Sequence, residues 1–235
     1  MDILEKLFGS SAKVRIMRLF LFNPDTHFDL EKIMTRAKIS QQEARSNVRI
    51  LNEIGLIKTR VFSKEVKLEP KPTSPRLRGS RKKGDGKRIV KRRVKGWILN
   101  ELFPYLPVLQ SFVITVSPLQ DRMIVRKFNK TGNIKLLIVS GVFIQEKDSR
   151  VDIFIVGDGL RRAAIDATVK DIEAELGKDL TYSFFETKDF QYRLTMYDKL
   201  IRDILDYPHK KLVNKLGIQA NSTKISVGKV QTSIL

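Results

Sequence analysis

Cysteine is absent from this chain of 235 residues, and histidine occurs only twice. The absence of cysteine excludes disulfide bonds, thiolate metal sites and a cysteine nucleophile. It also fits a reducing compartment. No apolar run approaches the ~20 residues of a membrane span, and residues 1–8 contain acidic side chains and no apolar signal core. We therefore expect a cytoplasmic protein that does not act at a membrane.

Acidic residues are scarce relative to basic ones. The 26 Asp and Glu face 45 Lys and Arg, which gives a formal net charge of +19 at pH 7. An excess of this size favours a polyanionic partner, with nucleic acid first and an anionic membrane surface second. The sequence also lacks a glycine-rich phosphate loop, a candidate Ser/His/Asp catalytic triad and histidines at the spacing of metal ligands. We therefore expect no cofactor.

One helix is defined by signals at both of its ends, between residues 39 and 57. Ser40 and Glu43 form a capping box, and Gly55 supplies the residue that commonly ends a helix. Apolar residues at helical spacing predict a buried stripe of Ala44, Val48, Leu51 and Ile54. The opposite side carries groups that bind base edges and phosphates, namely Gln41, Gln42, Arg45, Ser46 and Arg49. A DNA-recognition helix has this pattern, and so does an ordinary amphipathic surface helix.

The neighbouring segments favour the recognition helix. Residues 28–37 predict a short helix, and Lys38 and Ile39 predict a tight connection to the next one, so the pair would form a helix-turn-helix. Residues 56–62 and 88–94 predict two paired strands. Two strands that follow a recognition helix would form a wing.

Over roughly residues 8–98 the sequence resembles winged helix-turn-helix regulators of the ArsR/MarR type. The positions that follow the family pattern are Ile39, Ser40, Ala44, Arg45, Ser46, Val48, Leu51, Gly55 and Leu56. The order Arg45-Ser46 is the reverse of the Ser-Arg that is usual in that family. The resemblance implies a DNA-binding domain whose helix around Arg45 reads a DNA duplex.

A long basic segment separates the two expected strands. Proline, glycine, serine and basic residues dominate residues 69–87, so this segment has too few apolar side chains to form a core. It is either a solvated loop or a basic arm that contacts phosphates or enters a minor groove. The side chains that we expect to contact DNA from this region are Arg76, Arg78, Arg81, Lys82, Lys83, Lys87 and Arg88.

The second half of the chain alternates expected strands with expected helices. The strands are residues 134–144, 151–156 and 180–185, and the helices are residues 161–176 and 193–205. Such alternation predicts a small α/β unit.

Residues 134–206 resemble the minimal nucleotidyltransferase domain. That family holds divalent metal ions with two carboxylates that lie two residues apart on one strand face. Asp152 matches the second carboxylate and is our metal-ligand candidate, whereas Arg150 stands at the position of the first. The family's Gly-Ser element occurs here in reversed order as Ser140-Gly141. A guanidinium repels cations, so Asp152 is either a ligand in an incomplete site or a polar residue with a structural role.

The expected fold class is α+β. We expect a winged helix-turn-helix domain with a long basic wing at residues 1–98, a helical connector at 99–130, a nucleotidyltransferase-like α/β domain at 131–206, and a tail at 207–235. The expected function is that of a DNA-binding transcriptional regulator with an inactive nucleotidyltransferase-like domain. Its expected partner is double-stranded DNA, and a homodimer is the candidate assembly. Two alternatives are an active nucleotidyltransferase recruited to a nucleic acid or protein substrate, and an RNA-binding adaptor.

Overall fold

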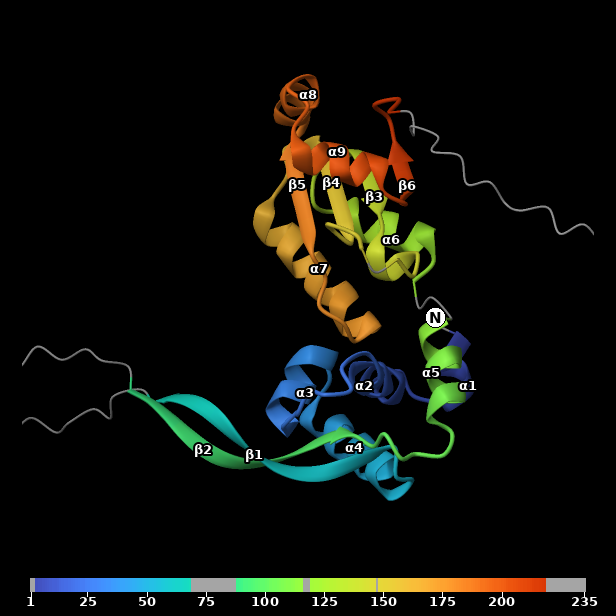
Figure 1. Cartoon of the computed structure of the whole chain (residues 1–235), viewed down its shortest axis with the longest axis vertical. Helices are drawn as coiled ribbons and strands as arrows, with labels where there is room; N and C mark the ends of the chain where they lie inside the picture. Colours follow the sequence, from blue (N-terminus) through green and yellow to red (C-terminus); the bar gives the residue numbers. More distant parts are fainter. Residues whose placement is uncertain (1–2, 69–87, 116–118, 147, 219–235) are drawn as a thin grey trace, which may run out of the picture. The chain divides into compact units, whose positions relative to one another are not determined.

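The computed structural model describes residues 3–68, 88–115, 119–146 and 148–218. It is 49% helical and 23% strand, which confirms the α+β class. The chain divides into two compact units, drawn in Figure 1 and described separately below. The first holds Met1–Val116 and Ala174–Lys178, and the second holds Ser117–Glu173 and Asp179–Leu235. Within the described ranges, no helix has the length and apolar character needed to cross a membrane.

The first unit packs five helices with a two-stranded ribbon. Its elements are α1 (Ile3–Phe8), α2 (Ser11–Phe22), α3 (Leu30–Ala37), α4 (Gln41–Glu53), β1 (Ile57–Leu68), β2 (Arg88–Leu99) and α5 (Leu106–Thr115). Side-chain caps set the helix starts, because Ser10 accepts the Lys13 N–H at α2 and Asp29 accepts the Lys32 N–H at α3. The buried faces of α2, α3 and α4 share one apolar core with Ile57 and Leu99, at the base of the ribbon.

The ribbon is longer than the sequence predicts. β1 and β2 pair antiparallel over 12 residues each, from Ile57 opposite Leu99 to Leu68 opposite Arg88. Figure 1 shows the ribbon extending well beyond α3 and α4. Phe28, just before α3, exchanges two backbone hydrogen bonds with Trp97, of 2.9 and 2.8 Å. This bridge fixes the base of the ribbon to the helical body.

The second unit is a four-stranded mixed sheet with helices. Its elements are α6 (Asp121–Phe128), β3 (Asn133–Val139), a 3-10 turn (Gly141–Phe143), β4 (Ile153–Asp158), α7 (Arg162–Leu176), β5 (Tyr182–Glu186), α8 (Thr187–Thr195), α9 (Lys199–Asp206) and β6 (Lys210–Asn214). The strand order is β5-β4-β3-β6, with β4 and β5 parallel and the other pairs antiparallel. α8 and α9 cover one face, where Phe190 and Ile201 pack on Phe154 and Leu136.

Three expectations about local structure were wrong. The expected helix at 193–205 is broken, because Tyr197 adopts a left-handed φ of 52° after α8 and Asp198 caps the new helix α9. The expected strand at 134–144 ends at Val139, before the turn at Gly141. Ile54 is 55% exposed, at the C-cap position directly after the last residue of α4, and so is not part of the buried stripe.

Residues assigned to the tail contribute a strand. β6 lies within residues 207–235 and pairs with β3, so the sheet continues beyond residue 206. The division between the two units falls within residues 99–130, which we expected to form a connector. The helices α5 and α6 therefore belong to different units.

Candidate nucleic-acid interface

The outer face of helix α4 is mainly polar, with Ile50 as an exposed apolar residue at 38%. Ser40 accepts the Glu43 N–H, and Glu43 accepts the Ser40 N–H at 2.9 Å, so the capping box is confirmed. The Ser40 hydroxyl donates to Glu43 Oε2 at 2.7 Å, and this bond, together with the Ser40 N–H, holds the pKa of the exposed Glu43 below its usual range. Ala44, Val48 and Leu51 are buried as expected. All five candidate side chains are exposed, namely Gln41, Gln42, Arg45, Ser46 and Arg49.

One of these candidates already has an acidic partner. The Arg49 Nε lies 2.7 Å from Glu53 Oε1, one helical turn away, and this hydrogen bond raises the pKa of Arg49. Both side chains are largely exposed, so the ion pair is weak and an incoming phosphate can displace Glu53. Arg45 lies one turn before Arg49 on the same side of the helix, which places two guanidiniums in line along the axis.

The outer face of α4 continues onto one face of the ribbon. The Thr59 hydroxyl in β1 donates to Asn52 Oδ1 in α4 over 3.3 Å. Asn52 lies three residues beyond Arg49 and therefore on the same side of the helix. Because side chains alternate along a strand, the residues that share the face of Thr59 further along the ribbon are Val61, Ser63 and Glu65 in β1 with Lys95, Arg93 and Lys91 in β2.

Three basic side chains form a row on that face. Lys91, Arg93 and Lys95 are all exposed and lie two residues apart in β2. A two-residue repeat in a strand places them about 7 Å apart, close to the spacing of phosphates along one DNA strand. We name Lys91, Arg93 and Lys95 the basic row. We did not predict this row from the sequence. The signal for it is that every second position in Lys91-Arg92-Arg93-Val94-Lys95 is basic, as a strand with one basic face requires.

The opposite face of the ribbon is fastened to the helical body. The Lys64 Nζ lies 2.6 Å from Asp29 Oδ2 and 2.7 Å from Glu31 Oε2, at the start of α3. Burial opposes the ionisation of Asp29, but hydrogen bonds from Lys64 and from the Lys32 N–H outweigh it and hold the pKa of Asp29 below its usual value. We call the ion pairs of Lys64 with Asp29 and Glu31 the clamp at Lys64. Beside it, a Cβ atom at Gly96 would lie 2.5 Å from the Phe28 carbonyl oxygen, so this close contact requires glycine. These contacts restrain the direction of the ribbon.

Some candidates cannot be placed. Arg76, Arg78, Arg81, Lys82, Lys83 and Lys87 lie outside the described residues. The backbone of Arg88 begins β2 opposite Leu68.

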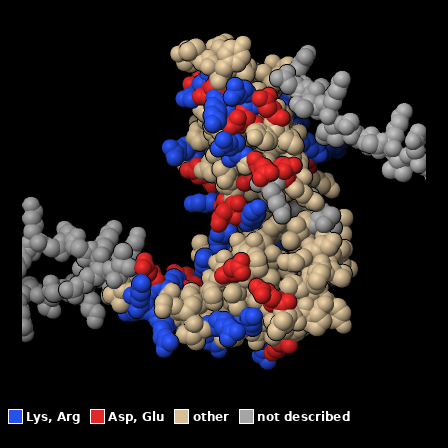
Figure 2. Space-filling view, in the orientation of Figure 1, with Lys and Arg blue, Asp and Glu red and all other residues tan. Residues whose placement is uncertain are grey.

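Positive charge is concentrated in the first part of the chain. Residues 1–116 hold 25 of the 45 Lys and Arg but only 11 of the 26 Asp and Glu, a net charge of +14. Figure 2 shows lysines and arginines along the ribbon, with few acidic side chains among them. The charge that favours a polyanion is therefore mainly on the unit that carries α4 and the ribbon.

The Asp152 carboxylate is used by the backbone around it. The Val142 N–H donates to Oδ1 at 3.0 Å, and the Thr181 N–H donates to Oδ2 at 2.9 Å. Asp152 thus ties the turn after β3 to the segment before β5. Arg150, at the position of the missing carboxylate, pairs with Asp203 Oδ2 at 3.0 Å. Among the described residues, no group of three His, Asp or Glu side chains could hold a metal ion.

Comparisons with protein families, with curated proteins and with solved structures gave no match for this chain.

Proposed function

We propose that the first unit is a winged helix-turn-helix domain that binds double-stranded DNA, and that the protein acts as a transcriptional regulator. The observation that carries the proposal is the continuity between the polar face of α4 and the basic row, joined through the Asn52–Thr59 hydrogen bond. In this proposal α4 lies in the major groove and the ribbon contacts the flanking backbone.

The connection between α3 and α4 supports this docking. Lys38 adopts a left-handed φ of 49° and ends α3, and Ser40 already caps α4. The two helices are therefore joined by a tight turn, and their inner faces share a core through Ile33, Ala44 and Val48. A rigid pair of this kind presents the N-terminal residues of its second helix to base edges. Gln41, Gln42, Arg45 and Ser46 occupy those positions, and Arg49 lies one turn further.

The basic row gives the ribbon the role of a wing. Lysine and arginine contacts to phosphates supply affinity without sequence information, whereas contacts to base edges supply the specificity. The clamp at Lys64 favours this division of roles, because its ion pairs with Asp29 and Glu31 hold the ribbon in place. The candidates between residues 76 and 87 would extend the phosphate contacts.

The second unit, in this proposal, is a nucleotidyltransferase-like domain that transfers no nucleotide. Metal-assisted transfer needs clustered carboxylates that hold ions against the triphosphate. Both oxygens of Asp152 accept backbone N–H groups, and the neighbouring position carries Arg150. A cation at this place would displace stabilising hydrogen bonds and meet a fixed positive charge. The proposal also includes a homodimer.

Fluorescence anisotropy with labelled oligonucleotides tests the class of nucleic acid. Duplex DNA, single-stranded DNA and double-stranded RNA of equal length should be compared at one salt concentration. We expect the tightest binding to duplex DNA, because the major groove of B-form DNA admits a helix and that of A-form RNA does not. Tighter binding to RNA would instead support the RNA-binding adaptor. Equal binding to all three would show that the protein recognises only the negative charge of nucleic acids.

A further inference from the structure

The corner between α8 and α9 exposes apolar side chains on a strained turn. Tyr192 and Met196 are each 64% exposed, and Tyr197 is 82% exposed. Tyr197 also adopts a φ of 52°, a left-handed conformation that an aromatic residue rarely takes. Strain of this kind persists only where the surrounding contacts enforce it, and it concentrates at functional surfaces.

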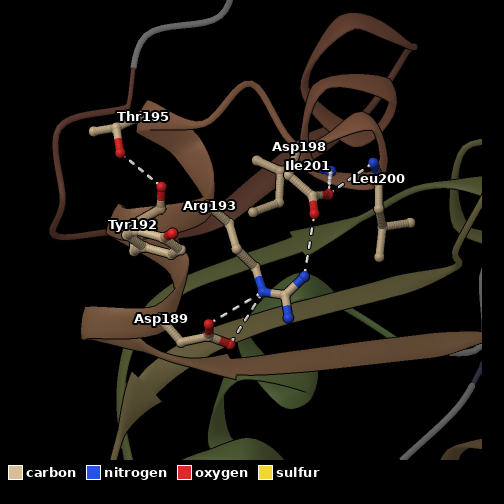
Figure 3. Close-up of polar contacts among 7 residues, drawn as sticks. All are labelled: Asp189, Tyr192, Arg193, Thr195, Asp198, Leu200 and Ile201. Carbon is tan, nitrogen blue, oxygen red and sulfur yellow. Dashed lines mark hydrogen bonds and ion pairs between the residues drawn. The ribbon is translucent and has the colours of Figure 1, made fainter.

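The surrounding contacts are visible in Figure 3. The Arg193 Nε donates to Asp189 Oδ1 at 3.1 Å, and its Nη1 donates to Asp198 Oδ2 at 3.1 Å. The other oxygen of Asp198 accepts the N–H groups of Leu200 and Ile201 at the start of α9. Arg193 therefore locks both ends of the turn, and the exposed position of Tyr197 is built into the fold.

A groove lies beside these exposed side chains. It has a volume of about 220 Å3 and is lined by Leu194, Tyr197, Asp198, Ile201, Arg202, Leu205 and Asp206. Its apolar lining comes from both helices. Arg202 and Asp206 lie one helical turn apart on α9, both exposed. Within the described part of the chain, the structure gives neither side chain an ion-pair partner.

This charge pattern is complementary to itself. When two copies of α9 meet antiparallel about a two-fold axis, Arg202 of each copy faces Asp206 of the other. Such self-complementarity is what a symmetric dimer interface requires. The apolar side chains of one copy can then fill the groove of the other, with Tyr197 as the knob.

We propose that the α8–α9 surface, defined here as Tyr192, Leu194, Met196, Tyr197, Arg202 and Asp206, binds a second copy of this chain. Tyr192, Met196 and Tyr197 are each at least 64% exposed, and large side chains of this kind supply the contact area that a specific complex needs, ~800 Å2 per partner. Residues 117–218 hold 18 Lys and Arg against 15 Asp and Glu, so their net charge is small and opposes the association of two copies only weakly. This inference rests on the homodimer of the proposed function and names its surface, and the dimer does not depend on DNA binding.

Sedimentation analysis of the full chain over a range of concentrations tests the proposal. We expect reversible dimerisation of the wild type. Arg202→Asp acts twice in a symmetric interface, because it removes two attractive pairs and creates two repulsive ones, so the dimer should weaken about 30-fold. The double variant Arg202→Asp/Asp206→Arg exchanges the charges and should bring the dissociation constant back to within about threefold of the wild type. Lys170→Asp is the matched control, since it makes the same charge change at an exposed residue of α7, which contributes nothing to the α8–α9 surface, and it should leave dimerisation unchanged.

A variant of the strained residue separates folding from association. Tyr197→Gly removes the knob and relieves the left-handed strain, so the dimer should weaken about tenfold or more while the melting temperature of the monomer does not fall. The proposal is overturned if the wild type stays monomeric at every concentration. It is also overturned if Arg202→Asp and Lys170→Asp have equal effects, if the charge exchange fails to restore the dimer, or if Tyr197→Gly dimerises like the wild type.

Discussion

Removing the basic row should change how DNA affinity responds to salt. The perturbation is the triple variant Lys91→Gln/Arg93→Gln/Lys95→Gln, which keeps long polar side chains on the ribbon and removes three charges. None of the three side chains makes a salt bridge among the described residues, and all three are exposed. The substitutions should therefore leave the fold of the first unit unchanged.

The magnitude follows from counterion release. Each phosphate that a protein neutralises adds about 0.9 to the slope of log affinity against log salt, so three contacts contribute about 2.7. Between about 50 and 200 mM salt, a slope of 2.7 corresponds to roughly a 40-fold change in affinity. The wild type should lose about 40-fold more affinity than the variant over this range.

Anisotropy titrations of one duplex at several salt concentrations measure both slopes. The matched control is Lys58→Gln/Arg60→Gln/Arg92→Gln, which removes three charges from the other face of the same ribbon. We expect this control to lower the slope by less than about 1. Equal losses of slope from the two triple variants would refute the assignment of one DNA-facing side. An unchanged slope in the first variant would show that the basic row does not contact phosphates.

Two further predictions concern carboxylates. Asp29→Asn keeps the helix cap but removes the charge that holds Lys64, so it should cost about 1 kcal/mol at neutral pH. Because the pKa of Asp29 is lowered from 3.8, its contribution is present above this value and is lost as the pH falls through the lower folded pKa. Thermal unfolding should therefore show a gap between wild type and variant that closes at acidic pH, and a gap independent of pH would contradict the clamp. Asp152→Asn should cost about 1–3 kcal/mol, because an amide cannot accept both the Val142 and Thr181 N–H groups. Neither wild type nor Asp152→Asn should transfer label from nucleoside triphosphates in the presence of magnesium or manganese, and transfer by the wild type that the variant abolishes would establish the enzyme alternative.

The sequence was most informative where local signals carry the structure. The capping box at Ser40 and the glycine at position 55 define the ends of one helix through contacts within a few residues. Such contacts can be recognised without knowledge of the fold. The outward direction of Gln41, Gln42, Arg45, Ser46 and Arg49 follows in the same way, from helical periodicity alone.

The sequence was less informative where distant residues decide the structure. The pairing of β6 with β3 joins segments about 70 residues apart, and its short, half-polar strand has no strong periodicity of its own. The break at Tyr197 depends on Arg193, which reaches both Asp189 and Asp198. Asp198, a good capping residue, was the one local signal for this break. The role of Asp152 likewise depends on N–H groups at Val142 and Thr181, which only the folded sheet brings together.

Selection from a random duplex library tests the central claim most directly. Wild-type protein should enrich a defined sequence, and Arg45→Ala should enrich a more relaxed one at the position that Arg45 reads, with a loss of about 1–3 kcal/mol if the contact is to guanine. The triple glutamine variant of the basic row should weaken binding without changing the enriched sequence. If variants at Gln41, Gln42, Arg45, Ser46 and Arg49 all retain the wild-type preference, or if the wild type enriches no sequence, then α4 is not a recognition helix.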